Sequence, residues 1–259
     1  MQEGHLERIR LAELESVREH FHPGMRVLEL GGGSGFQASI LSSWGCDITS
    51  IDFVDREPPH ENYFPVQNYD GKRIPFPDST FDVVFSSNVL EHVPDVAAFL
   101  KEIRRVLKSG GTSLHILPST SWRFWTSATH YVYALRWLFG IQPRVPGVVE
   151  PVPVGLVAKR LGVFSVIKQL ILAGPHGEYP TAVSELYYYS RKRWRRVFEE
   201  SGLHLTGIQS CGIFHTGYAI LPSASIHARK RMARWLGSSC FAVTAKSINH
   251  SGIKNDPLL

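Results

Sequence analysis

Residues 26–35, RVLELGGGSG, join a short apolar segment directly to a run of glycines. The apolar segment is typical of a buried strand, and the following FQASILSSWG (36–45) has the pattern of a helix. Glycines at a strand-to-helix turn let the backbone bend sharply and let a ligand approach closely, while the amino end of the helix favours a negative group. The stretch therefore predicts an α/β sheet whose first turn binds a nucleotide-type ligand.

The alternation of strand and helix continues along the chain. Further strands are predicted at 48–52, 81–87, 112–117, 203–209 and 239–247, with a weak one near 64–66. Helices are predicted at 5–21, 95–107 and 190–201, and Ser109-Gly110-Gly111 is expected to end the second of these. This order predicts parallel βαβ units in a doubly wound sheet.

Two insertions are expected to interrupt this sheet. The core covers about 22–118, 190–210 and 239–247 of a single domain spanning residues 1–259, and the insertions cover about 119–189 and 211–238. The insertions are predicted to be mostly helical, with helices at 121–139, 156–172 and 223–236. In open α/β sheets such insertions tend to lie over the carboxyl ends of the strands, where ligands bind.

The composition limits the partners and the compartment. The 259 residues include 28 Lys and Arg against 23 Asp and Glu, a formal charge of +5 that permits an anionic partner or a membrane surface without requiring one. No nucleic-acid-binding pattern is visible, so we expect no such partner. Three scattered cysteines suggest neither a disulfide framework nor a metal site, and neither a signal peptide nor a spanning segment is visible. A cytoplasmic protein is expected.

The acid before the glycines indicates which ligand the turn favours. The pattern from Glu29 to Gly35 is acid-x-G-x-G-x-G, whereas a dinucleotide fingerprint needs a third glycine where Phe36 or Ala38 stands. No Lys-Ser/Thr pair of a phosphate-binding P-loop follows. A carboxylate here suits a ligand that carries a cationic amine beside its own carboxylate. Asp52, at the end of the second strand, is placed to accept hydrogen bonds from both hydroxyls of a ribose.

VLELGGGSG (27–35), ITSID (48–52) and IPFPDSTFDVVFSSNVLEHVPDVAAFLKEIRRVLKSGGT (74–112) together resemble the class I S-adenosylmethionine-dependent methyltransferases. The similarity is greatest to the small-molecule branch with PFPD, FDVV and LEHV segments, which includes quinone-ring methyltransferases. It covers about residues 22–118, and a proline-rich stretch at 56–59 replaces the helix usual after the second strand. The resemblance implies a Rossmann-like, seven-stranded sheet with helical cap insertions, and S-adenosylmethionine as cofactor.

The resemblance also implies roles for individual residues. The backbone of Gly31, Gly33 and Gly35 would wrap the methionyl part of the cofactor, and Glu29 would hold its amino group directly or through water. The remaining cofactor contacts are expected from Asp52 at the ribose, Asp70 at the adenine amino group, Asn88 at the methionyl end, and Phe53 and Ile74 as apolar walls for adenine.

Methyl transfer from a sulfonium is an in-line displacement in which the protein mainly supplies alignment. A hydroxyl acceptor also needs a base. The candidates are His92 in LEHV and His176 and Glu178 in HGEY, with His130 and His215 as further histidines; a structural role is the alternative for each.

The acceptor is less defined than the cofactor. The aromatic helix of the first insertion suits a lid over a hydrophobic acceptor or a membrane interface. Basic runs at 191–196 and 229–234 suit either a solvated helix face or a phosphate-bearing acceptor. We therefore expect methyl transfer, at oxygen, to a small-molecule, sugar or lipid-type acceptor, with peripheral membrane contact left open. The alternatives are a non-catalytic cofactor-binding sensor or partner subunit, and an NAD-dependent oxidoreductase, against which Glu29 and the missing glycine argue.

Overall fold

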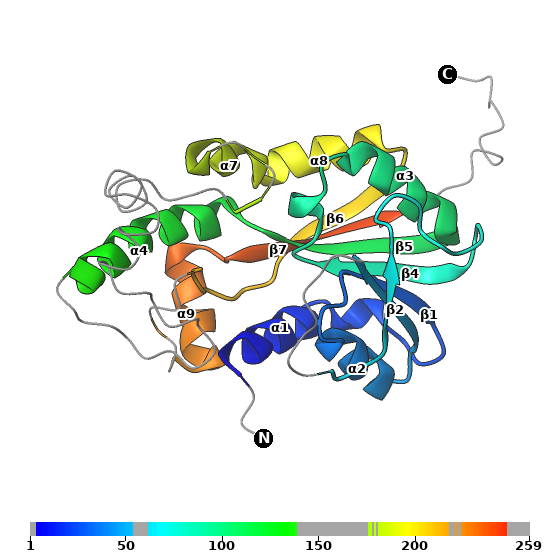
Figure 1. The fold of residues 1–259 in the computed structure, drawn as a ribbon, viewed down its shortest axis with the longest axis horizontal. Helices are drawn as coiled ribbons and strands as arrows, with labels where there is room; N and C mark the ends of the chain where they lie inside the picture. Colours follow the sequence, from blue (N-terminus) through cyan, green and yellow to red (C-terminus); the bar gives the residue numbers. More distant parts are fainter. Residues whose placement is uncertain are drawn as a thin grey trace, which may run out of the picture. The chain divides into compact units, whose positions relative to one another are not determined.

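The computed structural model describes residues 4–53, 62–138 (of 133–138 only the backbone), 176–177, 179, 181–217, 221 and 224–247 (Figure 1). The chain forms two compact units. The sheet unit comprises residues 14–117, 191–210 and 241–259, and the helical unit comprises 1–13, 118–190 and 211–240. Both insertions expected from the sequence fall in the helical unit. That the two units act as a single domain stays a prediction.

A seven-stranded sheet forms the centre of the sheet unit. The strands, in the order in which they lie side by side, are β3 (Val66–Tyr69), β2 (Asp47–Phe53), β1 (Arg26–Leu30), β4 (Phe81–Ser87), β5 (Leu107–Pro118), β7 (Cys240–Lys246) and β6 (His204–Ser210). Neighbours from β3 to β5 pair in parallel, and β6 and β7 pair antiparallel. The order reverses between β1 and β4, which is the point where open α/β sheets bind ligands.

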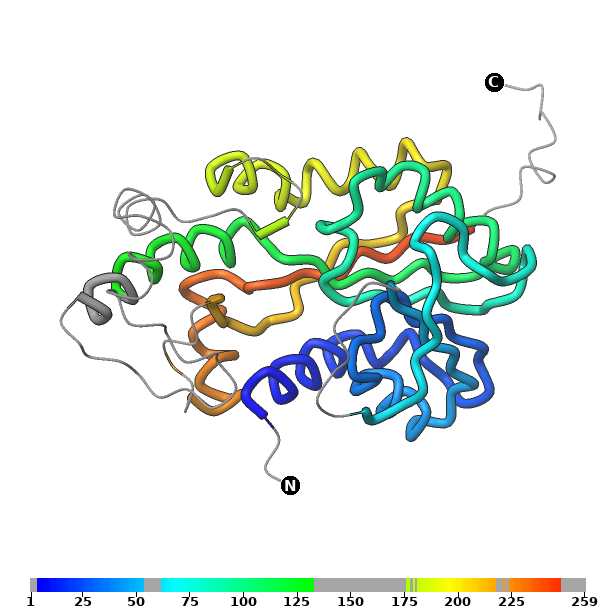
Figure 2. The backbone as a smooth tube through the Cα atoms, viewed as in Figure 1, coloured from blue at the N-terminus to red at the C-terminus, as the bar shows by residue number. Residues whose placement is uncertain are grey.

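Helices cover both faces of this sheet, as the backbone tube in Figure 2 also shows. Those of the sheet unit include α2 (Phe36–Ser43) on one face and α3 (Val96–Val106) and α8 (Arg191–Glu200) on the other. Right-handed βαβ crossovers on either side of the reversal place helices on opposite faces. The predicted doubly wound, Rossmann-like seven-stranded fold class is therefore confirmed.

The basic run that opens α8 belongs to an amphipathic helix. Trp194 and Phe198, four residues apart, are fully buried in the core, whereas Arg191, Lys192 and Arg195 are exposed. Residues at this spacing lie on one helix face. The run therefore forms the solvated face of a helix whose other face packs on the sheet.

One predicted helix end is wrong. Ser109-Gly110-Gly111 was expected to stop the helix, but α3 already ends at Val106 and these residues lie inside β5. The cause is strand pairing: Leu107 pairs with Phe81, and the register then shifts so that Thr112 pairs with Val83. The extra residues form an irregularity in the strand, where Gly110 adopts φ 76°.

Other elements differ from their predicted bounds only at the ends. The third strand is β3 at Val66–Tyr69 rather than 64–66, and the first helix splits into α1 (His5–Glu15) and a 3₁₀ turn at Arg18–His20. The helix predicted at 156–172 and the proline-rich stretch at 56–59 lie outside the described residues.

The helical unit contains α4 (Thr120–Leu138), α7 (Ala182–Tyr188) and α9 (Ile226–Leu236). A fully buried ion pair joins α4 to α7, with Arg123 Nη1 3.1 Å from Glu185 Oε2. Trp125 Nε1 donates to the carbonyl of Leu236 at the end of α9, at 2.9 Å. Among the described residues, no helix is long and apolar enough to cross a bilayer.

A polar triplet lies inside the sheet core. His115 of β5 is fully buried between Ser86 Oγ, 2.7 Å from Nδ1, and Ser113 Oγ, 2.6 Å from Nε2. A neutral imidazole has one donor and one acceptor nitrogen, so two hydroxyls satisfy it completely. Burial lowers the pKa of His115 from 6.5 to about 3.

This burial predicts a pH-dependent stability. Below pH 6.5 His115 binds a proton in the unfolded state, whereas in the folded state it stays neutral down to about pH 3. The free energy of unfolding therefore falls as the pH drops from 6.5 toward 3. His115→Gln should reduce this slope by up to about 1.4 kcal/mol per pH unit relative to wild type in urea titrations. His204→Gln, an exposed histidine on β6, is the control. Equal slopes in wild type and His115→Gln would contradict the assignment.

Candidate functional site

The glycine turn after β1 requires glycine for its backbone. Gly31, Gly33 and Gly35 have φ values of 73°, 68° and 75°, in the left-handed region that other residues rarely adopt. Space is also restricted, because a Cβ on Gly31 would overlap Val89 and one on Gly35 would overlap the backbone of Phe64. The turn is therefore a tight backbone loop directly before α2.

Hydrogen bonds tie this loop to the end of β2. The amides of Gly31 and Gly32 donate to the carbonyl of Ile51 at 2.8 and 3.2 Å. The amide of Gly33 donates to Asp52 Oδ2 at 2.9 Å. The loop and Asp52 thus form one preorganised unit, as a ligand clamp requires.

Glu29 is a buried acid beneath the loop. It is 2% exposed, and its Oε2 accepts a 2.6 Å hydrogen bond from Ser50 Oγ on β2. Burial raises the pKa of Glu29 to about 7; the Ser50 hydrogen bond opposes this rise and the Asp52 charge adds to it. A cation reaching this carboxyl would favour its ionised form and return the pKa toward its ordinary range.

The parallel register brings the predicted cofactor residues of the sheet unit to one edge. Glu29 is opposite Ser50, and Asp52 is opposite Asn68 near the end of β3. Asn88 directly follows β4, with φ 56°, a conformation that asparagine tolerates better than most residues. Carboxyl ends of neighbouring parallel strands meet at the same edge, so Glu29, the loop, Asp52 and Asn88 lie toward one edge of the sheet. That they bind a cofactor together stays a prediction.

The residues predicted for the adenine end differ in exposure: Phe53 and Asp70 are exposed, whereas Ile74 is buried. Phe53 is 51% exposed and its ring lies over Gly71, where a Cβ would overlap it. Asp70 is exposed and its Oδ1 accepts the amides of Lys72 and Arg73, of which the Lys72 bond contributes most to lowering its pKa. Ile74 is buried in the hydrophobic core.

Three residues of the site escaped sequence reasoning. Ser50 holds Glu29, Val89 packs against Gly31, and Tyr69 forms an edge-on ring contact with Phe53 at 6.5 Å between centroids. Burial, followed by the charges of Asp52 and Asp70, raises the pKa of Tyr69 to about 12. A signal for Ser50 existed, because it lies two residues before Asp52 and alternate strand residues share a face.

The candidate bases fall in both units. His92 ends a 3₁₀ turn (Leu90–His92) in the sheet unit, its side chain 42% exposed and its Nε2 3.9 Å from Glu91 Oε1. His176 belongs to the helical unit, where its ring packs on Trp122 at 4.7 Å and its amide donates to Glu185. His130 is buried on α4. Glu178 lies outside the described residues.

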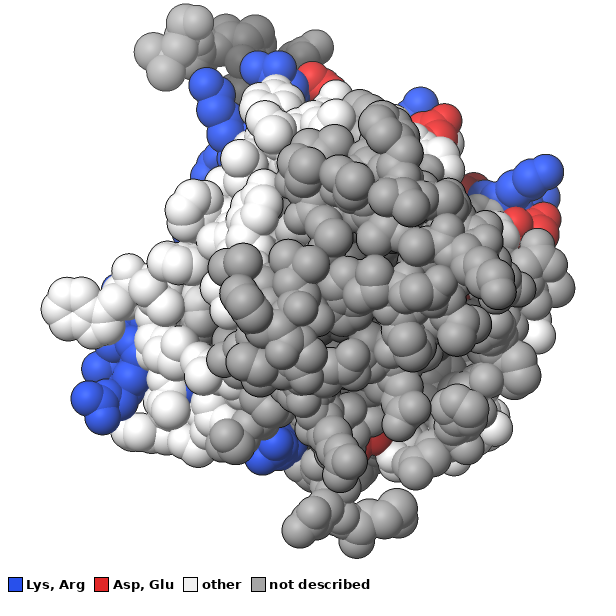
Figure 3. All heavy atoms as spheres, turned by 60° about the vertical axis from the view of Figure 1, so that its left-hand side comes forward, with Lys and Arg blue, Asp and Glu red and all other residues white. Residues whose placement is uncertain are grey.

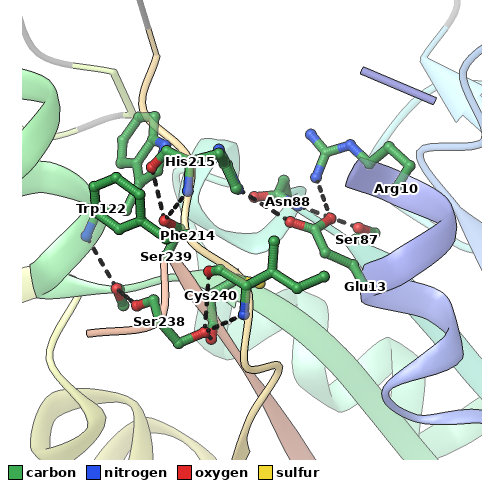
Figure 4. A network of polar contacts seen from close by, with 12 residues as sticks. Arg10, Glu13, Ser87, Asn88, Trp122, Phe214, His215, Ser238, Ser239 and Cys240 are labelled. Atoms are coloured by element: carbon green, nitrogen blue, oxygen red, sulfur yellow. Dashed lines mark hydrogen bonds and ion pairs between the residues drawn. The ribbon is translucent and has the colours of Figure 1, made fainter. Parts of the chain in front are cut away.

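His215 belongs to a polar network in the helical unit. Figure 4 shows Arg10 and His215 both pointing at Glu13, with Arg10 Nη1 at 2.7 Å and His215 Nε2 at 3.3 Å from its oxygens. Glu13 is fully buried; burial alone would raise its pKa, but Arg10 and His215 outweigh this and hold it at about 2. The acid is therefore fully compensated by its neighbours.

Comparisons with known proteins show which family model and which fold this chain resembles. Residues 28–114 match the sequence model of a family described as "Methyltransferase domain". An uncharacterized methyltransferase of Mycobacterium sp. (strain KMS) is 34% identical over 136 residues, which cover 49% of this chain and 53% of the relative. The ubiquinone biosynthesis O-methyltransferase of Paramagnetospirillum magneticum is 31% identical over 134 residues, covering 48% and 53%. The chain thus spans about half the length of these curated relatives.

A solved structure extends the similarity of fold to nearly the whole chain. The S-adenosylmethionine-dependent methyltransferase of Mesorhizobium loti superposes with a TM-score of 0.51 at 18% identity, covering 91% of this chain and 97% of its own. At this identity the likeness concerns the fold alone.

Proposed function

We propose that this chain, whose residues 28–114 match a methyltransferase-domain model, transfers a methyl group from S-adenosylmethionine to an oxygen of a small-molecule, sugar or lipid-type acceptor. One observation carries the proposal: a buried acid, Glu29, lies beneath a glycine loop whose neighbouring strand ends in Asp52. This donor set matches a ligand with a cationic amine at one end and a ribose next to it.

The residues of the loop fit this cofactor. Burial raises the pKa of Glu29 to about 7. An ammonium group beside it would stabilise the ionised carboxylate and lower this pKa. Asp52 accepts the Gly33 amide at Oδ2 and the Phe53 amide at Oδ1. A carboxylate offers about four lone-pair sites, so these two backbone bonds are compatible with hydrogen bonds from ribose hydroxyls. The left-handed glycines bring backbone, rather than side chains, against the ligand.

In this reaction the chain's own residues bind and orient. S-adenosylmethionine, when bound, supplies a methyl group that its sulfonium already activates. Glu29 and the loop fix the amino-acid end, Asp52 fixes the sugar, and Asn88 lines the same edge. Holding a donor and an acceptor in line provides a large part of the rate enhancement in such displacements.

A hydroxyl acceptor needs a group that takes its proton. We assign this role among His92, His176 and Glu178. His92 is supported by its position shortly after β4, four residues beyond Asn88, and by its exposed side chain. His176 is supported by the buried Glu185, whose Oε1 fixes the backbone amides of His176 and Gly177, both at 2.7 Å.

The helical unit supports an apolar acceptor. Phe124, Tyr131 and Val132 of α4 lie at helical spacing and are all more than 40% exposed. Exposed aromatic side chains of this kind suit either a lipid-type acceptor or contact with a membrane surface. The printed function of the quinone-pathway relative is in line with a small, apolar acceptor.

Removing the Asp52 carboxylate should weaken cofactor binding. Asp52→Ala loses the acceptor for the ribose hydroxyls and for the Gly33 amide, so we expect the Kd for S-adenosylhomocysteine to rise at least about tenfold in calorimetric titrations. The control is Asp47→Ala, which removes an exposed carboxylate at the opposite end of the same strand. Gly33→Asp should also weaken binding. Unchanged affinity in both site variants rejects the proposed site.

Cofactor binding should release a proton near pH 6. Glu29 is mostly protonated there because its pKa is about 7, and an ammonium group beside it favours ionisation. We expect release of up to about one proton at pH 6 and none from Glu29 at pH 8.5, measured by calorimetry in buffers of different ionisation enthalpy. Glu29→Gln should abolish this release, whereas Asp47→Asn should keep it. Equal release in wild type and Glu29→Gln contradicts the role of Glu29.

Turnover distinguishes an enzyme from a cofactor-binding sensor. Wild type should form S-adenosylhomocysteine with at least one member of a panel of phenols, polyprenyl quinols and sugars. With that acceptor, loss of a general base should lower kcat about 10²- to 10⁴-fold at unchanged cofactor affinity. His92→Gln and His176→Gln are measured separately, with the exposed His204→Gln as control. Tight binding without turnover on any acceptor favours the sensor.

A further inference from the structure

The helical unit contains a small cavity of its own. It has a volume of about 50 Å³, larger than the ~10–15 Å³ that one water needs. Its lining comes from α1, α4, the segment after β6 and α9, and includes His5, Thr129, His215, Thr216, Leu221 and Arg229. The described part of this lining is mostly apolar, with Phe214 and Leu221 beside imidazole, hydroxyl and guanidinium groups, and none of the described lining residues is a carboxylate.

Arg229 is the charged group of this cavity and is 4% exposed. Its Nη1 donates to the carbonyl of Phe214 at 3.1 Å and its Nη2 donates to the carbonyl of Leu221. Both acceptors are neutral, and a guanidinium has five donors. These bonds hold the group in place without compensating its charge.

The other strongly buried charges of this unit are compensated. Arg123 pairs with Glu185 at 3.1 Å, and Glu13 pairs with Arg10 at 2.7 Å (Figure 4). Within the described part of the chain, no carboxylate forms an ion pair with Arg229. A buried charge that lacks a partner is strongly destabilising, so such an arrangement suits a partner of opposite charge.

The surroundings of Arg229 further disfavour its positive charge. Burial, followed by the positive charge of Arg8, lowers the pKa of Arg229. The residue also stands in the first turns of α9, which has no acidic residue in its first turn, although helix amino ends favour negative groups. In the view of Figure 3, the visible Lys and Arg atoms of described residues form separate groups.

We propose that this cavity is a binding site for an oxyanion, the phosphate or carboxylate group of a small metabolite, with the Arg229 guanidinium as its counter-ion. Thr216, His5 and His215 line the same space. The Thr216 hydroxyl is a further hydrogen-bonding group there, whereas His215 already contacts Glu13 Oε1 through Nε2 at 3.3 Å. Arginine forms strong charge-assisted hydrogen bonds with both kinds of oxyanion. The site lies within the helical unit and does not depend on the methyl transfer proposed above.

The test measures thermal unfolding and calorimetric binding with inorganic phosphate and with acetate, at an ionic strength held constant with sodium chloride. Wild type should be stabilised by at least one of the two, and the one that stabilises identifies the class. Arg229→Gln should raise the Kd for that anion at least about tenfold. Arg231→Gln, an exposed arginine on the same helix, should leave it within about twofold.

A second variant keeps the test decisive should Arg229→Gln fail to fold. Thr129→Leu fills part of the cavity from α4 and leaves Arg229 intact, so it should also weaken binding at least about tenfold. Stabilisation of wild type by neither anion overturns the proposal. So does an equal loss in Arg229→Gln and Arg231→Gln, or full binding by Thr129→Leu.

Discussion

The hydrogen bonds from the Gly31 and Gly32 amides to the Ile51 carbonyl are the constraint on which the site depends. They join the turn after β1 to the end of β2, and the Gly33 amide adds a bond to the Asp52 carboxylate. Only left-handed glycines allow the chain to make these bonds and then enter α2 within a few residues. Backbone hydrogen bonds therefore determine the shape of the turn, and the side chains of Glu29 and Asp52 lie beside it.

Burial determines the pKa of Glu29, the acid beneath this turn. Glu29 has a serine as neighbour rather than a basic side chain, so desolvation dominates and raises its pKa to about 7. A surface glutamate in the same position would stay ionised and hydrated, and a ligand would first have to displace that water. A desolvated carboxyl beside a backbone turn that is fixed by its own hydrogen bonds is preorganised for a cation, which is the arrangement that strengthens electrostatic recognition.

The sequence predicted the sheet and the cofactor edge because both depend on local patterns. Short apolar strands, a glycine run and an acid near a strand end each act over a few residues, so the strands that carry or precede Glu29, Asp52 and Asn88 could be predicted. The roles of these three residues in cofactor binding stay predictions. Ser50 was missed because its role comes from pairing with Glu29 across the sheet. The Ser109-Gly110-Gly111 stretch misled for the same reason: pairing of Leu107 with Phe81 decided that β5 begins before it.

The basic runs of the sequence do not by themselves predict which arginines are buried. The basic run of α8 in the sheet unit and the basic run of α9 look alike as sequence, yet the first gives an exposed face and the second sends Arg229 into the interior. Arg123, equally buried, has its carboxylate from α7, 62 positions away. Arg229 has carbonyls instead, so its buried charge has no ion-pair partner among the described residues. A bound oxyanion, as proposed above, would supply the opposite charge.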